Sequence, residues 1–127
     1  MKKIILLIVI SIFTTSVSAK TYVCSESEKV LLDGVLITRS YSLDDYTAGS
    51  YPALKLKSPI DVNCEPDDDT CEPEKNVSIL QLWLDYAGNI QYEKLKGKEV
   101  KVYGTLFHRI TLTHHHTPII INVDSIK

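Results

Sequence analysis

Apolar residues recur at every second position in several short stretches of this chain, a spacing that fits β-strands rather than helices. In the clearest stretch, Val100, Val102, Gly104 and Leu106 alternate with charged or polar neighbours, and residues 119–123 repeat the pattern near the end. Because successive side chains of a strand point to opposite faces, each stretch turns one apolar face towards a core. The sequence therefore predicts a β-rich domain.

Three earlier stretches also predict strands. Residues 30–37 alternate branched apolar side chains, with Gly34 as a bulge or bend. Residues 54–57 predict a half-exposed strand that stops at Ser58-Pro59. Residues 77–84 predict a third strand, with Trp83 as its bulkiest side chain, which we expect in the core together with Phe107. The polar, turn-rich segment from Ser40 to Ser50 predicts a loop.

A short helix is expected between the third and fourth of these strands. In residues 86–95, Tyr92 and Leu95 lie at helical spacing, and Gly97 is a suitable C-terminal stop. Three strands, a helix and two strands is the element order of the small Greek-key barrel called the OB-fold. We therefore expect an all-β fold with one short helix, arranged as an OB-fold-like five-stranded barrel.

The N-terminus has the features of a secretory signal peptide. Lys2 and Lys3 precede the apolar residues 4–13, and the small residues 17–19 form a cleavage site. The apolar stretch is far shorter than the roughly 20 residues that span a bilayer. We expect a signal peptide at 1–19 and one mature domain at 20–127, periplasmic or secreted from a bacterium and not attached to the membrane.

The net charge of the expected mature chain limits the classes of partner that it can bind. Removing Lys2 and Lys3 lowers the basic residues from 14 to 12 against 16 acidic ones, a net charge of −4. Nucleic-acid binding requires a basic face, so this class of partner is not expected. The acidic, proline-bearing segment 63–75 predicts a solvated loop. Its acidic residues fall at EF-hand offsets, but Pro66 stands where that loop needs glycine.

Three cysteines remain after cleavage, Cys24, Cys64 and Cys71. Disulfides persist in exported proteins, so two of the three are expected to be bridged and one free. A Cys64–Cys71 bond would close a short local loop, whereas Cys24–Cys64 would constrain more of the unfolded chain. We favour Cys24–Cys64, with Cys64–Cys71 as the alternative.

All four histidines fall in one C-terminal stretch, His108 and His114, His115 and His116. Period-two geometry places His114 and His116 on one face and His115 on the other. If residues 109–113 turn the chain between the last two strands, His108 can lie opposite the His114/His116 pair. These three imidazoles could bind a metal ion, zinc or copper, as nitrogen ligands.

Two other interpretations of the histidines remain open. Thr111, Thr113 and Thr117 could satisfy the rings by hydrogen bonds, which would make the cluster structural. Alternatively the cluster binds another ligand. The residues expected at such a ligand-binding site are His108, Thr113, His114, His115, His116 and Thr117.

The histidine stretch resembles a known family. Its sequence is Gly104-Thr105-Leu106-Phe107-His108, followed by Thr113-His114-His115-His116-Thr117-Pro118-Ile119. It looks like the signature of a bacterial domain of unknown function, number 4431. Other segments that are similar to the family are Val30-x-Leu32-x-Gly34-x-Leu36, Leu80-Gln81-Leu82 and Gly97-Lys98-Glu99-Val100.

The resemblance implies a small, exported, OB-like protein with no established activity. Family members tend to carry a Phe-Pro-Gly-Pro-Pro segment after the first strand, where this chain has residues 41–46 instead. Any ligand contact made by that segment therefore does not carry over. Cys24 and Cys64 resemble the two cysteines of the family, and Cys71 looks like an addition.

The expected function is that of an exported, non-enzymatic binding module with the histidine hairpin as its working surface and a divalent metal as a candidate ligand. The alternatives are a metal-dependent or acid–base enzyme using the same histidines, and an envelope protein-interaction or inhibitor factor with structural histidines. No serine lies in a nucleophile-elbow context. The expected partner is a small molecule, a metal ion or an envelope protein. Aromatic residues could line an OB-type binding face; they are Tyr41, Tyr46, Tyr51, Trp83, Tyr86, Tyr92, Tyr103 and Phe107.

Overall fold

The computed structural model describes residues 19–127, which form six strands and one helix. The signal peptide predicted over residues 1–19 lies, up to residue 18, outside the described part. Among the described residues, no helix has the length and apolar character needed to cross a membrane. In chain order the elements are β1 (Lys20–Cys24), β2 (Val30–Ser42), β3 (Ala48–Cys64), β4 (Glu74–Trp83), α1 (Tyr86–Leu95), β5 (Glu99–His108) and β6 (Ile119–Ile126).

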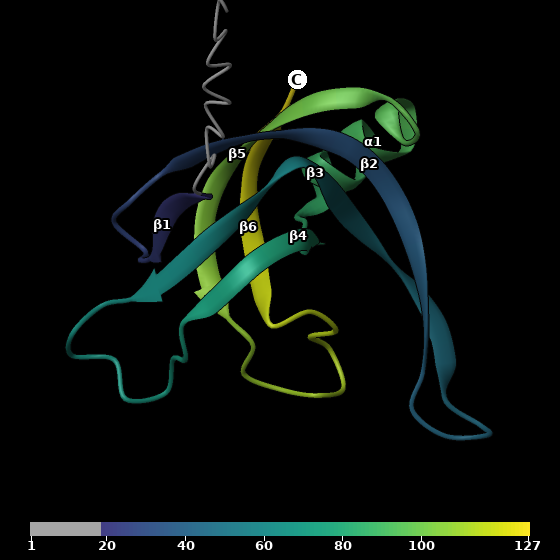
Figure 1. Cartoon of the computed structure of the whole chain (residues 1–127). Helices are drawn as coiled ribbons and strands as arrows, with labels where there is room; N and C mark the ends of the chain where they lie inside the picture. Colours follow the sequence, from purple (N-terminus) through teal and green to yellow (C-terminus); the bar gives the residue numbers. More distant parts are fainter. Residues whose placement is uncertain (1–18) are drawn as a thin grey trace, which may run out of the picture.

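The strands close into a barrel (Figure 1). Their order in the sheet is β1-β3-β2-β5-β6-β4, and β3 also pairs with β4, so five strands form a ring. Within that ring β4 and β6 are parallel and the other pairs antiparallel, while β1 lies parallel to β3 outside it. With α1 between β4 and β5, this is the five-stranded OB-like barrel that the element order predicted.

The inward face of each alternating stretch forms the core. Leu36 of β2, Leu54 of β3, Leu80 of β4, Val102 of β5 and Ile121 of β6 are all completely buried. Each strand of the ring thus contributes at least one such side chain, and burying one stabilises the fold by roughly 1.5–3 kcal/mol. The alternation therefore encodes the barrel directly.

Gly34 marks the place where β2 passes from one neighbour to the other. Residues 30–35 pair with β5 and residues 34–42 pair with β3, so Gly34 is paired on both sides. A Cβ there would overlap the backbone carbonyl of Lys55. Strand β2 arches over the barrel in Figure 1.

The segment from Ser40 to Ser50 is not a loop, contrary to the prediction. Ladder pairs between β2 and β3 run from Gly34↔Leu56 out to Ser42↔Ala48, and only residues 43–47 turn the chain. We call residues 38–52 the β2–β3 arm. It reaches well beyond the barrel in Figure 1. Because most of its side chains are exposed, the arm lacks the apolar alternation that would have revealed it.

Strand β3 also continues past Ser58-Pro59, where the prediction ended it. Its pairing with β4 shifts register between Lys55 and Ile60, and Val62 is buried beyond the shift. The irregularity lets the strand include a proline, which lacks the N–H that a regular ladder needs. The extension brings the end of β3 to Cys64 and the acidic loop.

The disulfide joins Cys64 to Cys71, with 5.8 Å between their Cα atoms, so the predicted Cys24–Cys64 bond is wrong. Cys24 lies beside Cys64 in the β1–β3 register, yet it is a free thiol within the hydrophobic core. Burial, aided by the charge of Asp68, raises the pKa of this thiol to about 11. The loop between β3 and β4 brings Cys71 back to Cys64 instead, which gives the alternative pairing expected from the sequence.

Helix α1 has the predicted bounds. The Asp85 carboxylate accepts a hydrogen bond from the Gly88 N–H and caps its start, while Gly97, with φ of 84°, follows its end. Tyr92 is buried, and its hydroxyl donates to the Ile37 carbonyl oxygen at 3.0 Å. Trp83 is 44% exposed, so its predicted place in the core is wrong, and Phe107 is only half-buried.

Candidate functional site

The segment between β5 and β6, residues 109–118, is closed by the backbone hydrogen bond from Arg109 N–H to the Pro118 carbonyl oxygen, at 2.8 Å, and is held inside by a histidine. We call it the β5–β6 loop. The Nδ1 atom of His115 accepts hydrogen bonds from the backbone N–H groups of Ile110, at 3.0 Å, and Thr111, at 3.2 Å. The buried His115 ring also meets Trp83 and Phe107 edge-on, with centroids 5.2 and 5.4 Å away. His115 thus organises the loop from inside.

Gln81 of β4 fixes the second half of this loop. Its side-chain oxygen accepts from the His116 N–H at 2.6 Å, and its side-chain nitrogen donates to the His114 carbonyl oxygen at 2.8 Å. Its backbone N–H donates to the Thr117 hydroxyl oxygen at 2.9 Å. Gln81 is buried. Sequence reasoning did not identify this residue as functional; a glutamine between Leu80 and Leu82 in an apolar strand was the available signal.

His116 joins the loop to the β2–β3 arm. Its ring stacks on Tyr41 with centroids 3.9 Å apart and planes at 19°, and on Tyr51 at 4.8 Å and 25°. Tyr41 and Tyr51 come from β2 and β3, the two strands of the arm. The stack therefore unites the β5–β6 loop and the β2–β3 arm, two strand connections of the kind that OB-folds use for binding, into one surface.

Two of the imidazoles favour the neutral state. Burial lowers the pKa of His115 below its usual value of 6.5, and the neighbouring charges of His114 and His116 lower it further. The pKa of His116 is lowered by burial first and then by His114. At neutral pH both rings are uncharged, which suits the acceptor role of His115 and the stacking of His116.

The structure does not bring His108, His114 and His116 together as one set of metal ligands. The His116 ring packs against Tyr41 and Tyr51, and His114 is an exposed loop residue whose N–H donates to Thr111 Oγ1 at 3.3 Å. Of the hydroxyl residues predicted for the site, Thr113 is exposed and Thr117 is buried against Gln81. Period-two geometry fails here because residues 109–118 are not a strand.

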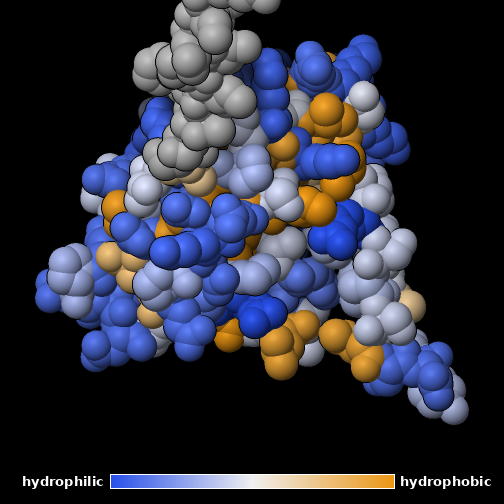
Figure 2. Space-filling view, viewed as in Figure 1, coloured by the Kyte–Doolittle hydropathy of each residue, from blue (hydrophilic) through white to orange (hydrophobic). Residues whose placement is uncertain are grey.

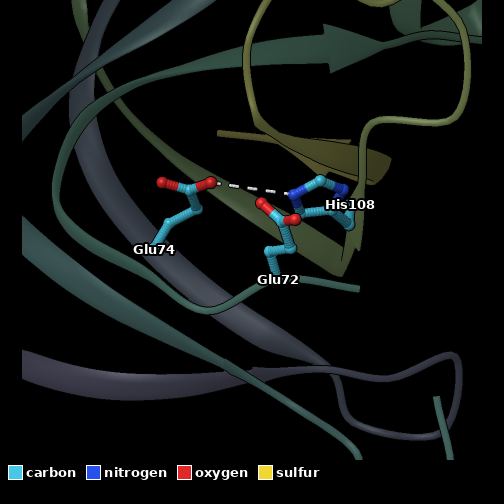
Figure 3. Close-up of side chains that lie close together, drawn as sticks. All are labelled: Glu72, Glu74 and His108. Carbon is cyan, nitrogen blue, oxygen red and sulfur yellow. Dashed lines mark ion pairs between the residues drawn. The ribbon is translucent and has the colours of Figure 1, made fainter. Parts of the chain in front are cut away.

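His108 instead faces two glutamates that were not predicted from the sequence (Figure 3). Its Nε2 atom lies 3.7 Å from Oε1 of Glu74, and one ligand atom each of Glu72, Glu74 and His108 lie within 4.8 Å of one another. Glu72 belongs to the acidic loop and Glu74 begins β4. Both glutamates follow Cys71 closely in the sequence. Only knowledge of the Cys64–Cys71 disulfide would have indicated where this segment lies in the fold.

One comparison bears on the family. Residues 79–127 match the family model described as Domain of unknown function (DUF4431). This match bears out the predicted resemblance to the family over these residues. No curated protein and no solved structure matches the chain.

The family match includes most of the residues that make the contacts of the β5–β6 loop. Gln81, His108, His115 and His116 all lie inside it, together with β5, β6 and α1. The stacking partners of His116 on the arm lie outside it, as do Glu72 and Glu74. The surface around His116 thus combines a loop inside the matched residues with a hairpin outside them.

Proposed function

We propose that this protein is an exported, non-enzymatic module that binds a partner protein through a surface formed by the β5–β6 loop and the β2–β3 arm. The observation that carries the proposal is the stacking of His116 on Tyr41 and Tyr51. It holds the loop against the arm before any partner arrives. Pre-ordering of this kind reduces the conformational entropy lost on binding.

Exposed apolar side chains gather on both segments. Ile110 and Leu112 of the loop are 79% and 68% exposed, and Tyr46 at the tip of the arm is 97% exposed. In Figure 2, hydrophobic residues mark the lower edge of the molecule, where the loop and the arm lie in Figure 1. Exposed aromatic and aliphatic residues at loop tips are typical anchors of protein–protein interfaces.

The charge of the mature chain supports a protein partner over nucleic acid. Its expected net charge of −4 supplies no basic face for phosphates, and the exposed acidic loop adds to the repulsion. The hydroxyl of Thr117 and the side chain of Gln81 are both satisfied internally, so they are not available to a small polar ligand. The large exposed side chains Ile110, Leu112 and Tyr46 offer apolar and aromatic area instead.

Site-specific photo-crosslinking tests this proposal. A photoreactive residue replaces Leu112 or Tyr46 in the full chain, and Glu93, exposed on α1, serves as the control position. We expect one discrete crosslinked adduct from positions 112 and 46 and none from position 93. The double variant Ile110→Ser/Leu112→Ser should lose the adduct from position 46 while unfolding at the same temperature. Equal crosslinking at all three positions, or none, would contradict the proposal.

A further inference from the structure

We propose that Glu72, Glu74 and His108 form a binding site for a divalent transition-metal ion, zinc in particular. The three residues come from the acidic loop, the start of β4 and the end of β5 (Figure 3). This site is separate from the surface around His116, and the proposed protein binding does not depend on it.

The tautomer of His108 points to a cation. Its Nδ1 atom lies 3.1 Å from the carbonyl oxygen of Arg109, an acceptor, so Nδ1 carries the hydrogen. In the neutral ring Nε2 then presents a lone pair. That atom is buried and, within residues 19–127, has no hydrogen-bond partner. Its nearest charged neighbour is the Glu74 carboxylate at 3.7 Å.

A lone pair facing a carboxylate is repulsive, and leaving a buried nitrogen unpaired costs roughly 1–3 kcal/mol. A metal ion between the two groups removes both penalties, since it accepts electron density from each. The Nδ1–H···O=C bond is the usual way in which a metal-ligating histidine is oriented. The ring is therefore already set for binding through Nε2.

The spacing also fits a coordination sphere. Ligands about 2.0–2.1 Å from zinc in tetrahedral geometry lie roughly 3.4 Å from one another. The Nε2–Oε1 separation of 3.7 Å is close to that value, and all three ligand atoms lie within 4.8 Å. Small side-chain adjustments would complete the set, because Glu72 is exposed and Glu74 is half-buried.

The local structure holds the ligands in place. The Cys64–Cys71 disulfide fixes the chain immediately before Glu72. The Asp68 carboxylate of the same loop, whose pKa is lowered first by hydrogen bonds from Thr70, adds negative potential near His108. One imidazole with two carboxylates favours zinc over calcium, which prefers oxygen ligands alone. Water would occupy the remaining position.

Calorimetric titration of the chelator-treated, disulfide-intact mature protein with zinc chloride tests the site. We expect one equivalent to bind, with affinity reduced at least tenfold in Glu74→Gln and in His108→Ala. The matched controls are Asp67→Asn, an exposed carboxylate of the same loop, and His114→Ala, an exposed imidazole; both should bind as the parent does. Thermal unfolding of each metal-free variant confirms that it is folded.

A second measurement does not depend on the variants. In imidazole nitrogen NMR spectra, zinc should shift the His108 Nε2 resonance selectively and leave its Nδ1–H in place. The proposal is overturned if no stoichiometric binding occurs, if affinity falls with His114→Ala or Asp67→Asn as much as with Glu74→Gln, or if calcium binds equally well without His108. Loss of zinc binding with protein crosslinking intact would leave the proposed function unaffected.

Discussion

The ring of His116 lies on the ring of Tyr41, with centroids 3.9 Å apart and an angle of 19° between the planes. One residue belongs to the loop between β5 and β6, the other to the strand that begins the β2–β3 arm. Their contact joins the two segments into one unit. The histidines thus have separate tasks: His115 folds the loop, His116 attaches it, and His108 faces a pair of glutamates.

Replacing either ring of the stack should destabilise the protein. We expect Tyr41→Ala and His116→Ala each to lower the free energy of unfolding, with a coupling energy of about 0.5–1.5 kcal/mol in the double-mutant cycle. Urea unfolding at pH 7.5 measures both quantities. Tyr46→Ala, at a fully exposed tyrosine on the same arm, should be close to neutral. A coupling energy near zero would mean that the rings do not interact in solution.

Acidification should weaken the fold through His115. The folded pKa of His115 lies below its ordinary value of 6.5, so the unfolded chain binds more protons in the interval between the two values. The stability contributed by the neutral ring is therefore complete above pH 6.5 and is lost as the pH falls towards the folded pKa. A protonated Nδ1 could no longer accept from Ile110 and Thr111.

Urea unfolding at pH 7.5 and pH 5.5 measures this dependence. His115→Asn, whose amide oxygen can replace Nδ1 as an acceptor without titrating, should show a smaller drop between the two pH values than the parent. His114→Asn, at the exposed neighbour, should keep most of the drop. An equal drop in the parent and in His115→Asn would refute the assignment.

Gly104 should not tolerate a side chain. A Cβ at this position would overlap the backbone carbonyl of Asn122, where β5 and β6 shift register. We expect Gly104→Ala to lower the free energy of unfolding by about 1–3 kcal/mol, because the two strands must separate to admit the methyl group. Gly88→Ala in the helix is the comparison and should change stability by less than about 1 kcal/mol. Equal effects would place the strands further apart than the structure does.

Thiol labelling should identify Cys24 as the unreactive cysteine. The native protein should label slowly, because Cys24 is buried and its pKa is raised to about 11. After denaturation without reductant, one thiol per mature chain should label, and peptide mapping should place the label on Cys24. A label on Cys71 would instead support the Cys24–Cys64 pairing. Breaking the Cys64–Cys71 bond should cost about 2 kcal/mol of stability, as expected for a short closed loop.

The barrel was predictable wherever one face of a strand is buried. Leu36, Val102 and Ile121 lie inside because their stretches alternate, and the helix bounds followed from spacing and from Gly97. Strand β1 and the arm were not predicted, because they lack this alternation. Most side chains of the arm are exposed, and β1 has only five residues, of which Cys24 alone is buried, so neither segment leaves an apolar period in the sequence.

The site was only partly predictable. The histidine clustering correctly located a segment with specific contacts, but the partners of each ring are distant in sequence: Gln81, Tyr41 and Glu74 approach only when the barrel closes. The predicted site of three imidazoles assumed that the alternation of a β-strand continues through the histidine segment. The loop follows its own path because His115 and Gln81 satisfy its backbone. The pairing of Cys64 with Cys71 also depends on the path of the acidic loop between them.

Proton NMR of the His116 ring tests the central claim most directly, that the loop is seated on the arm in the free protein. The account predicts ring protons of His116 shifted upfield by the two tyrosine rings, nuclear Overhauser contacts to Tyr41 and Tyr51, and a return of the shifts towards unstructured values in Tyr41→Ala. Ring protons at unstructured positions in the parent, with no contact to either tyrosine, would contradict it.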